Sequence, residues 1–296
     1  MPQNNILNTT AETKSLNEDF LSQLFCSFFF TIFAITSKII SVWQLKRKGM
    51  FLLMYANFSQ VYDQLNGEEF YHAWFEFLQP YLTTHNKVLD LGCGSGTLLV
   101  KLLEQGHLVT GVDLSVEMLA IAKNKLESVG SNYTLYEEDM AGFYENNEQY
   151  DIIISTCDSI NYLNSQQKVA QLFSHISTML KPEGFFLFDV HSDKIFEEHF
   201  PSWSYADSDE NVSVLWNTFT TDGKMFEHDL TFFIKQYSGT YQRFDERHQQ
   251  YFYKNTELTG LLQQYFSNIQ CISDFTDVYN KDGDRDFYII KKTKCL

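Results

Sequence analysis

Three glycines at alternate positions, placed between an apolar strand pattern and an apolar helix pattern, constrain this chain more than any other feature. The stretch reads VLDLGCGSGTLL from Val88 to Leu99, with Gly92, Gly94 and Gly96 in the middle. The residues before the glycines have the apolar, β-branched character of a strand buried on both faces, and those after them fit a helix. A glycine turn between two such elements lets a ligand approach the backbone closely. The sequence therefore predicts an α/β fold with a ligand at this turn.

The residues around the glycines separate the ligand classes that use this geometry. A Walker-type phosphate loop needs four residues between its glycines and a Gly-Lys-Ser/Thr ending, and neither is present. A dinucleotide fingerprint has the spacing G-x-G-x-x-G, whereas these glycines alternate and follow Asp90. An acid at that position would repel a pyrophosphate but suits a ligand that carries an ammonium group.

The stretch from Asp90 to Gly96 resembles the first motif, D/E-x-G-x-G-x-G, of the class I S-adenosylmethionine-dependent methyltransferases. A second motif of this family, an acid at the end of the next strand, is matched by Asp113 in LVTGVD. The stretch YEEDM resembles the family's acid after the third strand, which falls on Asp139. The resemblance covers residues from about 54 to the C-terminus and implies S-adenosyl-L-methionine as the cofactor.

The resemblance also implies roles for individual residues. Asp90 would bind the donor's amino group through water, Asp113 both ribose hydroxyls, and Asp139 the adenine amino group. The simpler alternatives are that Asp90 caps the helix and that Met118 and Tyr62 only fill the core, although the ring of Tyr62 would also suit a sulfonium cation. The expected cofactor-binding residues are Asp90, Gly92, Gly94, Gly96, Asp113, Leu114, Met118, Asp139, Met140 and Tyr62.

Candidate acceptor and catalytic residues follow the later strands. His191 comes directly after the fifth strand, where ligands meet the carboxyl ends of parallel strands, and it is the expected general base. Its alternative is a surface or capping histidine. Asp158, Asn161 and Tyr162 after the fourth strand are expected to contact the acceptor, unless they cap the next helix. Arg247 in the insert could meet an acidic acceptor, but strand alternation could equally place it in solvent.

The expected architecture is a Rossmann-like methyltransferase fold: a central, mostly parallel seven-stranded sheet with helices on both faces and a three-stranded antiparallel insert. Residues 54–190 and 254–296 would form the cofactor-binding domain and residues 191–253 the insert, with turn signals at 221–223 and 237–239. The insert resembles the cap that small-molecule members place over the donor. Such a cap holds the reactants together and excludes water, which favours in-line methyl transfer.

The first 53 residues form a separate N-terminal extension. A charge-free aromatic run from Phe20 to Thr36 is followed by Lys46, Arg47 and Lys48. A membrane-spanning helix needs about 20 apolar residues, so this segment is borderline, and the basic cluster would hold the enzyme domain in the cytosol. The alternatives are a peripheral amphipathic helix or a non-native extension, with Met54 as the natural start. Membrane contact is expected only through residues 20–48.

Charge and cysteine content limit the partners. The whole chain has a net charge of −16. Residues 1–53 carry +2, so the rest of the chain carries −18. An acidic body repels phosphate backbones, so a nucleic-acid substrate is disfavoured. The five scattered cysteines fit a reducing, cytoplasmic location. The stretch NKDGDRD from Asn280 lacks the first acid of a calcium loop, so no metal is implied.

The predicted activity is methyl transfer from S-adenosylmethionine to nitrogen or oxygen of a small-molecule acceptor. One alternative is an RNA or protein methyltransferase of the same fold. Another is an NAD-dependent oxidoreductase, which the glycine spacing and Asp90 oppose. The third alternative is a non-catalytic protein that binds S-adenosylmethionine. The sequence indicates no oligomeric state and does not name the acceptor.

Overall fold

The computed structural model describes residues 69–236 and 238–293. Tyr62 and the apolar segment of residues 20–48 lie outside the described residues, so the predictions made for them stay predictions. Within the described ranges, no helix is both long enough and apolar enough to cross a membrane.

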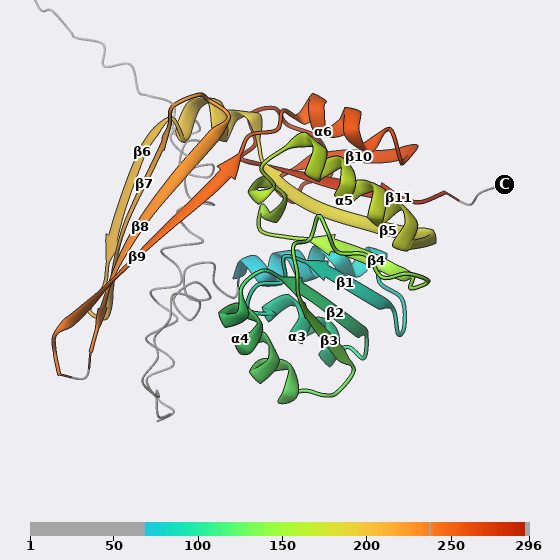
Figure 1. Cartoon of the computed structure of the whole chain (residues 1–296), viewed down its shortest axis with the longest axis horizontal. Helices are drawn as coiled ribbons and strands as arrows, with labels where there is room; N and C mark the ends of the chain where they lie inside the picture. Colours follow the sequence, from blue (N-terminus) through green and yellow to red (C-terminus); the bar gives the residue numbers. More distant parts are fainter. Residues whose placement is uncertain (1–68, 237, 294–296) are drawn as a thin grey trace, which may run out of the picture.

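Strands and helices alternate through most of the chain, as the sequence predicts (Figure 1). Serine side chains begin two of the helices: Ser115 accepts a hydrogen bond from the backbone of Met118, and Ser165 accepts one from that of Lys168. The elements of the α/β body are a helix over residues 69–78, η1 (Gln79–Tyr81), β1 (Lys87–Leu91), α3 (Thr97–Glu104), β2 (Leu108–Asp113), α4 (Val116–Glu127), β3 (Tyr133–Glu137), β4 (Tyr150–Ser155), η2 (Ser159–Tyr162), α5 (Gln166–Met179), β5 (Leu180–His191), α6 (Asn255–Leu262), β10 (Asn268–Ser273) and β11 (Arg285–Lys291).

The body is built on one seven-stranded sheet with the order β10-β11-β5-β4-β1-β2-β3. Strands β1 to β5 pair in parallel, and β11 is antiparallel to both β5 and β10. The strand order reverses between β1 and β4, and ligands bind at the carboxyl ends of strands beside such a reversal. The predicted Rossmann-like fold with a mostly parallel seven-stranded sheet is confirmed.

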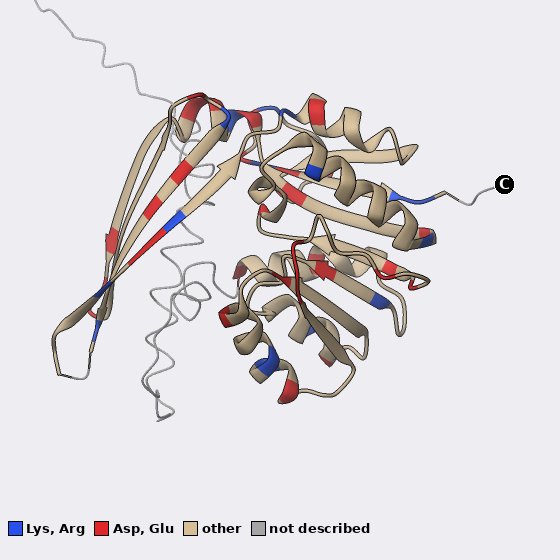
Figure 2. Ribbon diagram, in the orientation of Figure 1, with Lys and Arg blue, Asp and Glu red and all other residues tan. Residues whose placement is uncertain are grey.

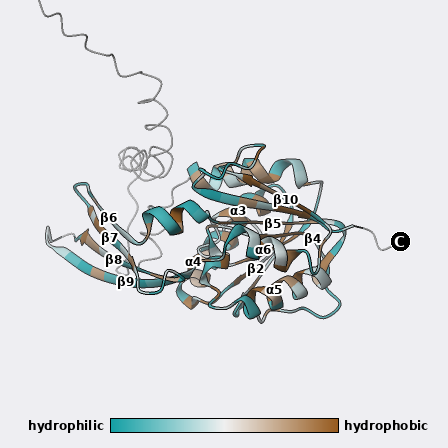
Figure 3. Cartoon of the chain, turned by 90° about the horizontal axis from the view of Figure 1, so that it is seen from above, coloured by the Kyte–Doolittle hydropathy of each residue, from teal (hydrophilic) through white to brown (hydrophobic). Residues whose placement is uncertain are grey.

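Helices cover both faces of this sheet because its strands are apolar on both sides. On one face, α5 and α6 pack on alternate strand residues, including Leu89, Ile153 and Phe186. On the other face, the helix of residues 69–78 and helices α3 and α4 pack on the strand residues that alternate with these, such as Val88 and Ile152. In Figure 3 the hydrophobic colour lies on the central strands, while the helices show both colours. Both layers of the predicted core are therefore present.

The insert contains one strand more than expected. It holds a short π-helical turn, η3 (Ile195–His199), and the antiparallel sheet β6 (Ser202–Ser208), β7 (Val212–Thr220), β8 (Met225–Lys235) and β9 (Tyr241–Tyr251). Both predicted turns lie where expected. The sequence analysis missed β6 because the exposed alternate residues of SWSYADS are three serines and an alanine, which lack the β-branched side chains typical of strands. Figure 1 shows the four strands extending from the body as a long ribbon; we call them the cap sheet.

Two element ends and one connection complete the body. The stretch LKPEG begins strand β5 at Leu180, with Glu183 at a left-handed φ of 67°. Helix α6 ends at Leu262. The residues between β10 and β11, which include NKDGDRD, connect two antiparallel strands.

Candidate active site

The glycine turn lies at the carboxyl end of β1 and is tied to the end of β2. The backbone N–H groups of Gly92 and Cys93 donate to the carbonyl of Val112 at 2.8 and 3.0 Å. A Cβ on Gly92 would lie 2.6 Å from Oγ of Ser159 and 3.3 Å from Cε of Met140. Gly92 is therefore required where the loops after β1, β3 and β4 converge.

Gly94 faces a different environment. Its φ of 52° is left-handed, and no atom of the described residues lies within 4 Å of the position that a Cβ would occupy. The third glycine, Gly96, packs its backbone closely on Ala122 of α4, 2.8 Å from the position of a Cβ. The turn is thus packed on both sides and open at its centre, which leaves bare backbone accessible to a ligand.

Asp113 ends β2 and faces the glycine turn. Its Oδ2 accepts a hydrogen bond from the backbone of Gly94 at 2.8 Å, and its Oδ1 accepts one from Ser115 at 2.9 Å. Each carboxylate oxygen can accept a second bond, so two further donors can be bound. A pair of neighbouring hydroxyls would use both positions.

Asp90 is buried beneath the turn, with 1% of its surface exposed. Its Oδ1 has no hydrogen-bond partner among the described residues. Burial, and then the nearby charge of Asp113, raise the pKa of Asp90 to about 8. A buried carboxyl group in this state would be stabilised as a carboxylate by a cationic ligand.

Asp139 follows β3 and contacts two partners. Its carboxylate accepts from Nζ of Lys168 and from the backbone of Ala141, each at 2.9 Å. Burial opposes ionisation of Asp139, but these partners outweigh it, and the pKa lies below its ordinary value. Asp139 is therefore an ionised hydrogen-bond acceptor on the same side as Gly92.

The two residues expected on the helix after β2 differ in exposure. The side chain of Leu114 is 69% exposed, whereas Met118 is half-buried in the first turn of α4. Both follow Asp113 closely in the chain, after the carboxyl end of β2.

The loop after β4 is strained. Cys157 and Asp158 have left-handed φ values of 58° and 52°, which are uncommon for residues other than glycine. The backbone N–H of Asp158 donates to Oδ2 of Asp189 on β5 at 3.1 Å, which helps to hold this conformation. Such conformations concentrate at functional sites.

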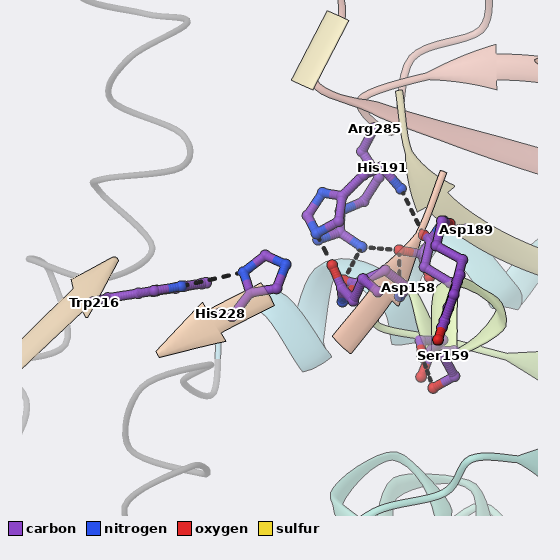
Figure 4. A network of polar contacts seen from close by, with 11 residues as sticks. Asp158, Ser159, Asp189, His191, Trp216, His228 and Arg285 are labelled. Carbon is purple, nitrogen blue, oxygen red and sulfur yellow. Dashed lines mark hydrogen bonds and ion pairs between the residues drawn. The ribbon is translucent and has the colours of Figure 1, made fainter. Parts of the chain in front are cut away.

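The carboxylate of Asp158 is the centre of a buried polar network (Figure 4). Nε2 of His191 lies 3.4 Å from Oδ2 of Asp158, and Nε2 of Gln250 donates to the same oxygen. Arg285 donates to Oδ1 at 2.8 Å. Burial raises the pKa of Asp158, but His191 and Arg285 outweigh this effect, so the pKa lies well below its ordinary value. Asp158 is therefore ionised and holds three side chains.

Arg285, the first residue of β11, joins two acids. Its guanidinium contacts Asp158 and also Oδ2 of Asp189, which is fully buried. It also lies over the ring of Phe70, 5.3 Å from the centroid. Burial raises the pKa of Asp189, and Arg285 acts against this effect. One cation thus connects β11 to the ends of β4 and β5.

His191 ends β5 and is positioned from several sides. Its backbone N–H donates to Oδ1 of Asn161 at 3.2 Å. Its ring packs edge-on against Phe196 and Phe200, with centroid distances of 5.8 and 5.0 Å. With Nε2 directed at Asp158, Nδ1 is the nitrogen that remains for another partner.

Two residues predicted to contact the acceptor already have partners within the protein. Asn161 is fully buried, and within the described residues its amide binds backbone groups, accepting from His191 and donating to Tyr251 at 3.0 Å. Arg247 lies on the exposed face of β9 and pairs with Asp229 and Glu227 on β8. Strand alternation explains the exposed position of Arg247, because its neighbours in the chain lie on the opposite face of β9. Asn161 is a structural tie, and Arg247 is a surface residue.

The other two predicted acceptor residues remain at the site. Asp158 has the central position described above, and Tyr162 is 45% exposed, with its ring edge-on to His248 at 6.0 Å. The sequence analysis missed Gln250, Asp189 and Arg285. The alternation of β9 could have indicated that Gln250 lies on the buried face of the strand. No local pattern could have indicated that Arg285 pairs with Asp158.

Comparisons with known proteins agree with this geometry. A family model described as "Methyltransferase domain" matches residues 88–184. The Bacillus subtilis protein named "Putative methyltransferase YqeM" is 35% identical over 248 residues, which span 82% of this chain and 99% of that protein.

Solved structures extend the likeness to the whole fold. An S-adenosylmethionine-dependent methyltransferase from Clostridium acetobutylicum has a TM-score of 0.72 and 27% identity, covering 80% of this chain and 98% of that one. CalS10 from Micromonospora echinaspora, an amino pentose methyltransferase solved with S-adenosylmethionine bound, shares the fold with a TM-score of 0.63 at 15% identity, covering 82% and 100% of the two chains.

The fold and the site define a Rossmann-like α/β enzyme with a glycine turn and acidic residues at one sheet edge. Together with the full-length relative, they show that the chain belongs to the class I S-adenosylmethionine-dependent methyltransferases. S-adenosylmethionine is the cofactor, which confirms the expectation from the sequence. This membership argues against the alternative that the chain is an NAD-dependent oxidoreductase.

Proposed function

We propose that this methyltransferase methylates nitrogen or oxygen of a small-molecule acceptor, with His191 as the general base. The observation that carries the proposal is the 3.4 Å contact between Nε2 of His191 and Oδ2 of the ionised Asp158. This pair lies at the same sheet edge as the glycine turn, because Ser159 next to Asp158 touches Gly92.

The donor fits the residues around the glycine turn. The free acceptor positions of Asp113 suit the two ribose hydroxyls, and the buried carboxyl of Asp90 suits the ammonium group. Asp139 and Met140 are placed for the adenine, and Gly94 leaves backbone open to the ligand. When bound, S-adenosylmethionine supplies a methyl group on a positively charged sulfur: the acceptor's lone pair bonds to the methyl carbon while the carbon–sulfur bond breaks and its electron pair stays on sulfur.

His191 would take the proton that the acceptor loses. Asp158 holds the Nε2 side of the ring, which leaves Nδ1 unprotonated in the neutral histidine and able to accept a proton. Arg285 and Gln250 hold Asp158 in turn, so the base is oriented by a chain of contacts. If the acceptor is an amine, the proton transfer is less demanding, and the positioning of the two reactants contributes more of the rate.

Several observations support a small molecule rather than a nucleic acid. The chain carries a net charge of −16, and Figure 2 shows its basic residues scattered among the described elements. The cap sheet, which we assign to the predicted insert of residues 191–253, brings β9 to the site through Gln250. CalS10, which shares this fold, acts on an amino pentose. The scattered cysteines support a cytoplasmic location.

The test of this proposal is the variant His191→Ala. A metabolite pool incubated with the enzyme and donor labelled in the methyl group identifies a methylated acceptor. With that acceptor, kcat should fall by about 10²- to 10⁴-fold, because a general base contributes that much. Donor affinity measured by calorimetry should stay within about threefold, and His72→Ala, at an exposed histidine, is the control. A fully active His191→Ala variant would remove His191 from the mechanism.

A further inference from the structure

Two buried polar atoms on the face of the cap sheet that carries Gln250 have no role in the mechanism proposed above, which uses only the amide nitrogen of Gln250. His228 on β8 is 3% exposed and Gln250 on β9 is 4% exposed. In the part of the chain that the structure describes, Nε2 of His228 and Oε1 of Gln250 have no hydrogen-bond partner. Buried polar groups are normally paired, so each of these atoms calls for a partner beyond the described residues, and a bound ligand can supply it.

The hydrogen-bond role of His228 follows from its neighbour Trp216. Nε1 of Trp216, which can only donate, contacts Nδ1 of His228 at 3.2 Å, so Nδ1 is an acceptor (Figure 4). Burial, with the nearby His191 and His248, lowers the pKa of His228 to about 4, although Asp158 acts in the opposite direction. The ring is therefore neutral, and its proton is on Nε2. Nε2 is a hydrogen-bond donor.

The role of Gln250 follows in the same way from Asp158. The carboxylate of Asp158 can only accept, so the NH₂ group of Gln250 must face it. The carbonyl oxygen Oε1 then points elsewhere, as a hydrogen-bond acceptor. His228 and Gln250 thus offer one donor and one acceptor.

These two groups lie on the same face of the cap sheet. His228 pairs with His248, and Gln250 is two residues further along β9. Residues two apart on a strand face the same side, so His228 and Gln250 are diagonal neighbours, with Cα atoms about 7–8 Å apart. Phe200 connects them to the proposed base, because its ring packs edge-on to His228 at 4.8 Å and to His191 at 5.0 Å.

The charge state of a matching ligand is also restricted. A carboxylate would be repelled by Oε1 of Gln250 and by Asp158 behind it, and an ammonium group could not accept from Nε2–H of His228. A hydroxyl group satisfies both, because its oxygen accepts one hydrogen bond and its proton donates another.

We propose, on the basis of the proposed function, that His228 and Gln250 select an acceptor with a neutral hydroxyl beside the methylated atom. The hydroxyl oxygen accepts from Nε2 of His228, and its hydrogen is donated to Oε1 of Gln250. The two residues are specificity-determining contacts, and His191 remains the base. An acceptor that lacks this hydroxyl leaves both buried groups unpaired and is rejected.

The test uses acceptors that differ by one hydroxyl. The purified full-length enzyme is assayed with methyl-labelled S-adenosylmethionine against trans-2-aminocyclohexanol and cyclohexylamine, and against catechol and phenol. The wild type should prefer the member with the extra hydroxyl by at least about tenfold in kcat/KM. In His228→Phe and in Gln250→Leu this preference should fall below about threefold. In His228→Gln, which keeps a donor, part of the preference should return.

Two control variants carry the same substitutions at exposed positions. His72→Phe and Gln249→Leu, the latter on the opposite face of β9, should keep the wild-type preference. Donor binding by calorimetry should be unchanged in all variants. Nitrogen NMR of the wild type should show the Nε2–H form of His228, which requires no variant to fold.

Three results would overturn the inference. They are an unchanged preference in His228→Phe and Gln250→Leu, the Nδ1–H form of His228, and absence of methylation of all four compounds by a wild type that binds the donor. None of these results affects the donor assignment. A failure of the proposed function would show itself differently, as a fully active His191→Ala variant.

Discussion

The guanidinium of Arg285 lies 2.8 Å from Oδ1 of Asp158, although 127 positions separate these residues in the chain. The contact joins the start of the last strand to the strained loop after β4. Since Asp158 also holds His191, a residue near the C-terminus helps to position the proposed base. The same guanidinium balances Asp189, which has no exposed surface.

Replacing Arg285 by Met should destabilise the protein strongly. The change leaves Asp158 and Asp189 buried without their cation, and breaking a buried ion pair costs about 3–5 kcal/mol of unfolding free energy. Urea denaturation at pH 7 measures this loss. Arg243→Met is the matched control, because Arg243 pairs with Asp245 on the exposed face of β9 and should have little effect. Similar losses in both variants would show that the Arg285 contacts contribute no more than a surface pair.

Replacing Asp113 by Ala should weaken donor binding. The variant loses the carboxylate proposed to accept from both ribose hydroxyls, and hydrogen bonds to charged groups are strong enough to change Kd by about 10- to 100-fold. Calorimetry with S-adenosylmethionine measures the change. Glu127→Ala removes the same charge from the far end of α4 and should bind normally. Unchanged affinity in Asp113→Ala would contradict the ribose assignment.

Asp90 should make the stability of the donor-free protein fall as pH rises. Its pKa is about 8 in the folded protein and near 4 in the unfolded chain, so between these values the folded state binds one proton more. The free energy of unfolding therefore falls by up to about 1.4 kcal/mol per pH unit within that window. Asp90→Asn should have a flatter profile between pH 5 and 8 in thermal or urea denaturation. Parallel profiles for the two proteins would disprove the shift.

Replacing Gly92 by Ala should affect both folding and donor binding. The new Cβ would lie 2.6 Å from Oγ of Ser159, in addition to the strain of a residue with φ of +83°. Gly223→Ala is the control, since Gly223 has a similar φ of +69° but no described atom within 4 Å of the position of a Cβ. The control should lose about 1 kcal/mol of stability and keep its donor affinity, while Gly92→Ala loses more of both. Equal effects would mean that the close approach to Ser159 has no importance.

The sequence was sufficient to predict where the glycine turn and Asp113 lie in the fold. Gly92, Gly94 and Asp113 lie at the ends of adjacent parallel strands, and the apolar strands and their spacing are local properties of the chain. Parallel strands bring their carboxyl ends to one edge, so a motif at each end predicts a common site. The predicted fold class followed from the same local patterns.

The acceptor side depended on contacts that local patterns do not contain. Gln250 meets Asp158 across 92 positions, and strand β6 is held in the sheet by antiparallel pairing with β7. Arg247 and Gln250 lie on opposite faces of β9. A shift of one residue in the register of β9 would move each of them to the other face.

The sequence by itself determined the glycine turn, the strand that carries Asp113 and the family, because these rest on backbone preferences and residue spacing. Only the tertiary structure decided that Arg285, Gln250 and His191 meet at Asp158. The physical reason is that strand pairing and its register select which distant side chains share a buried space, and burial then determines their charge.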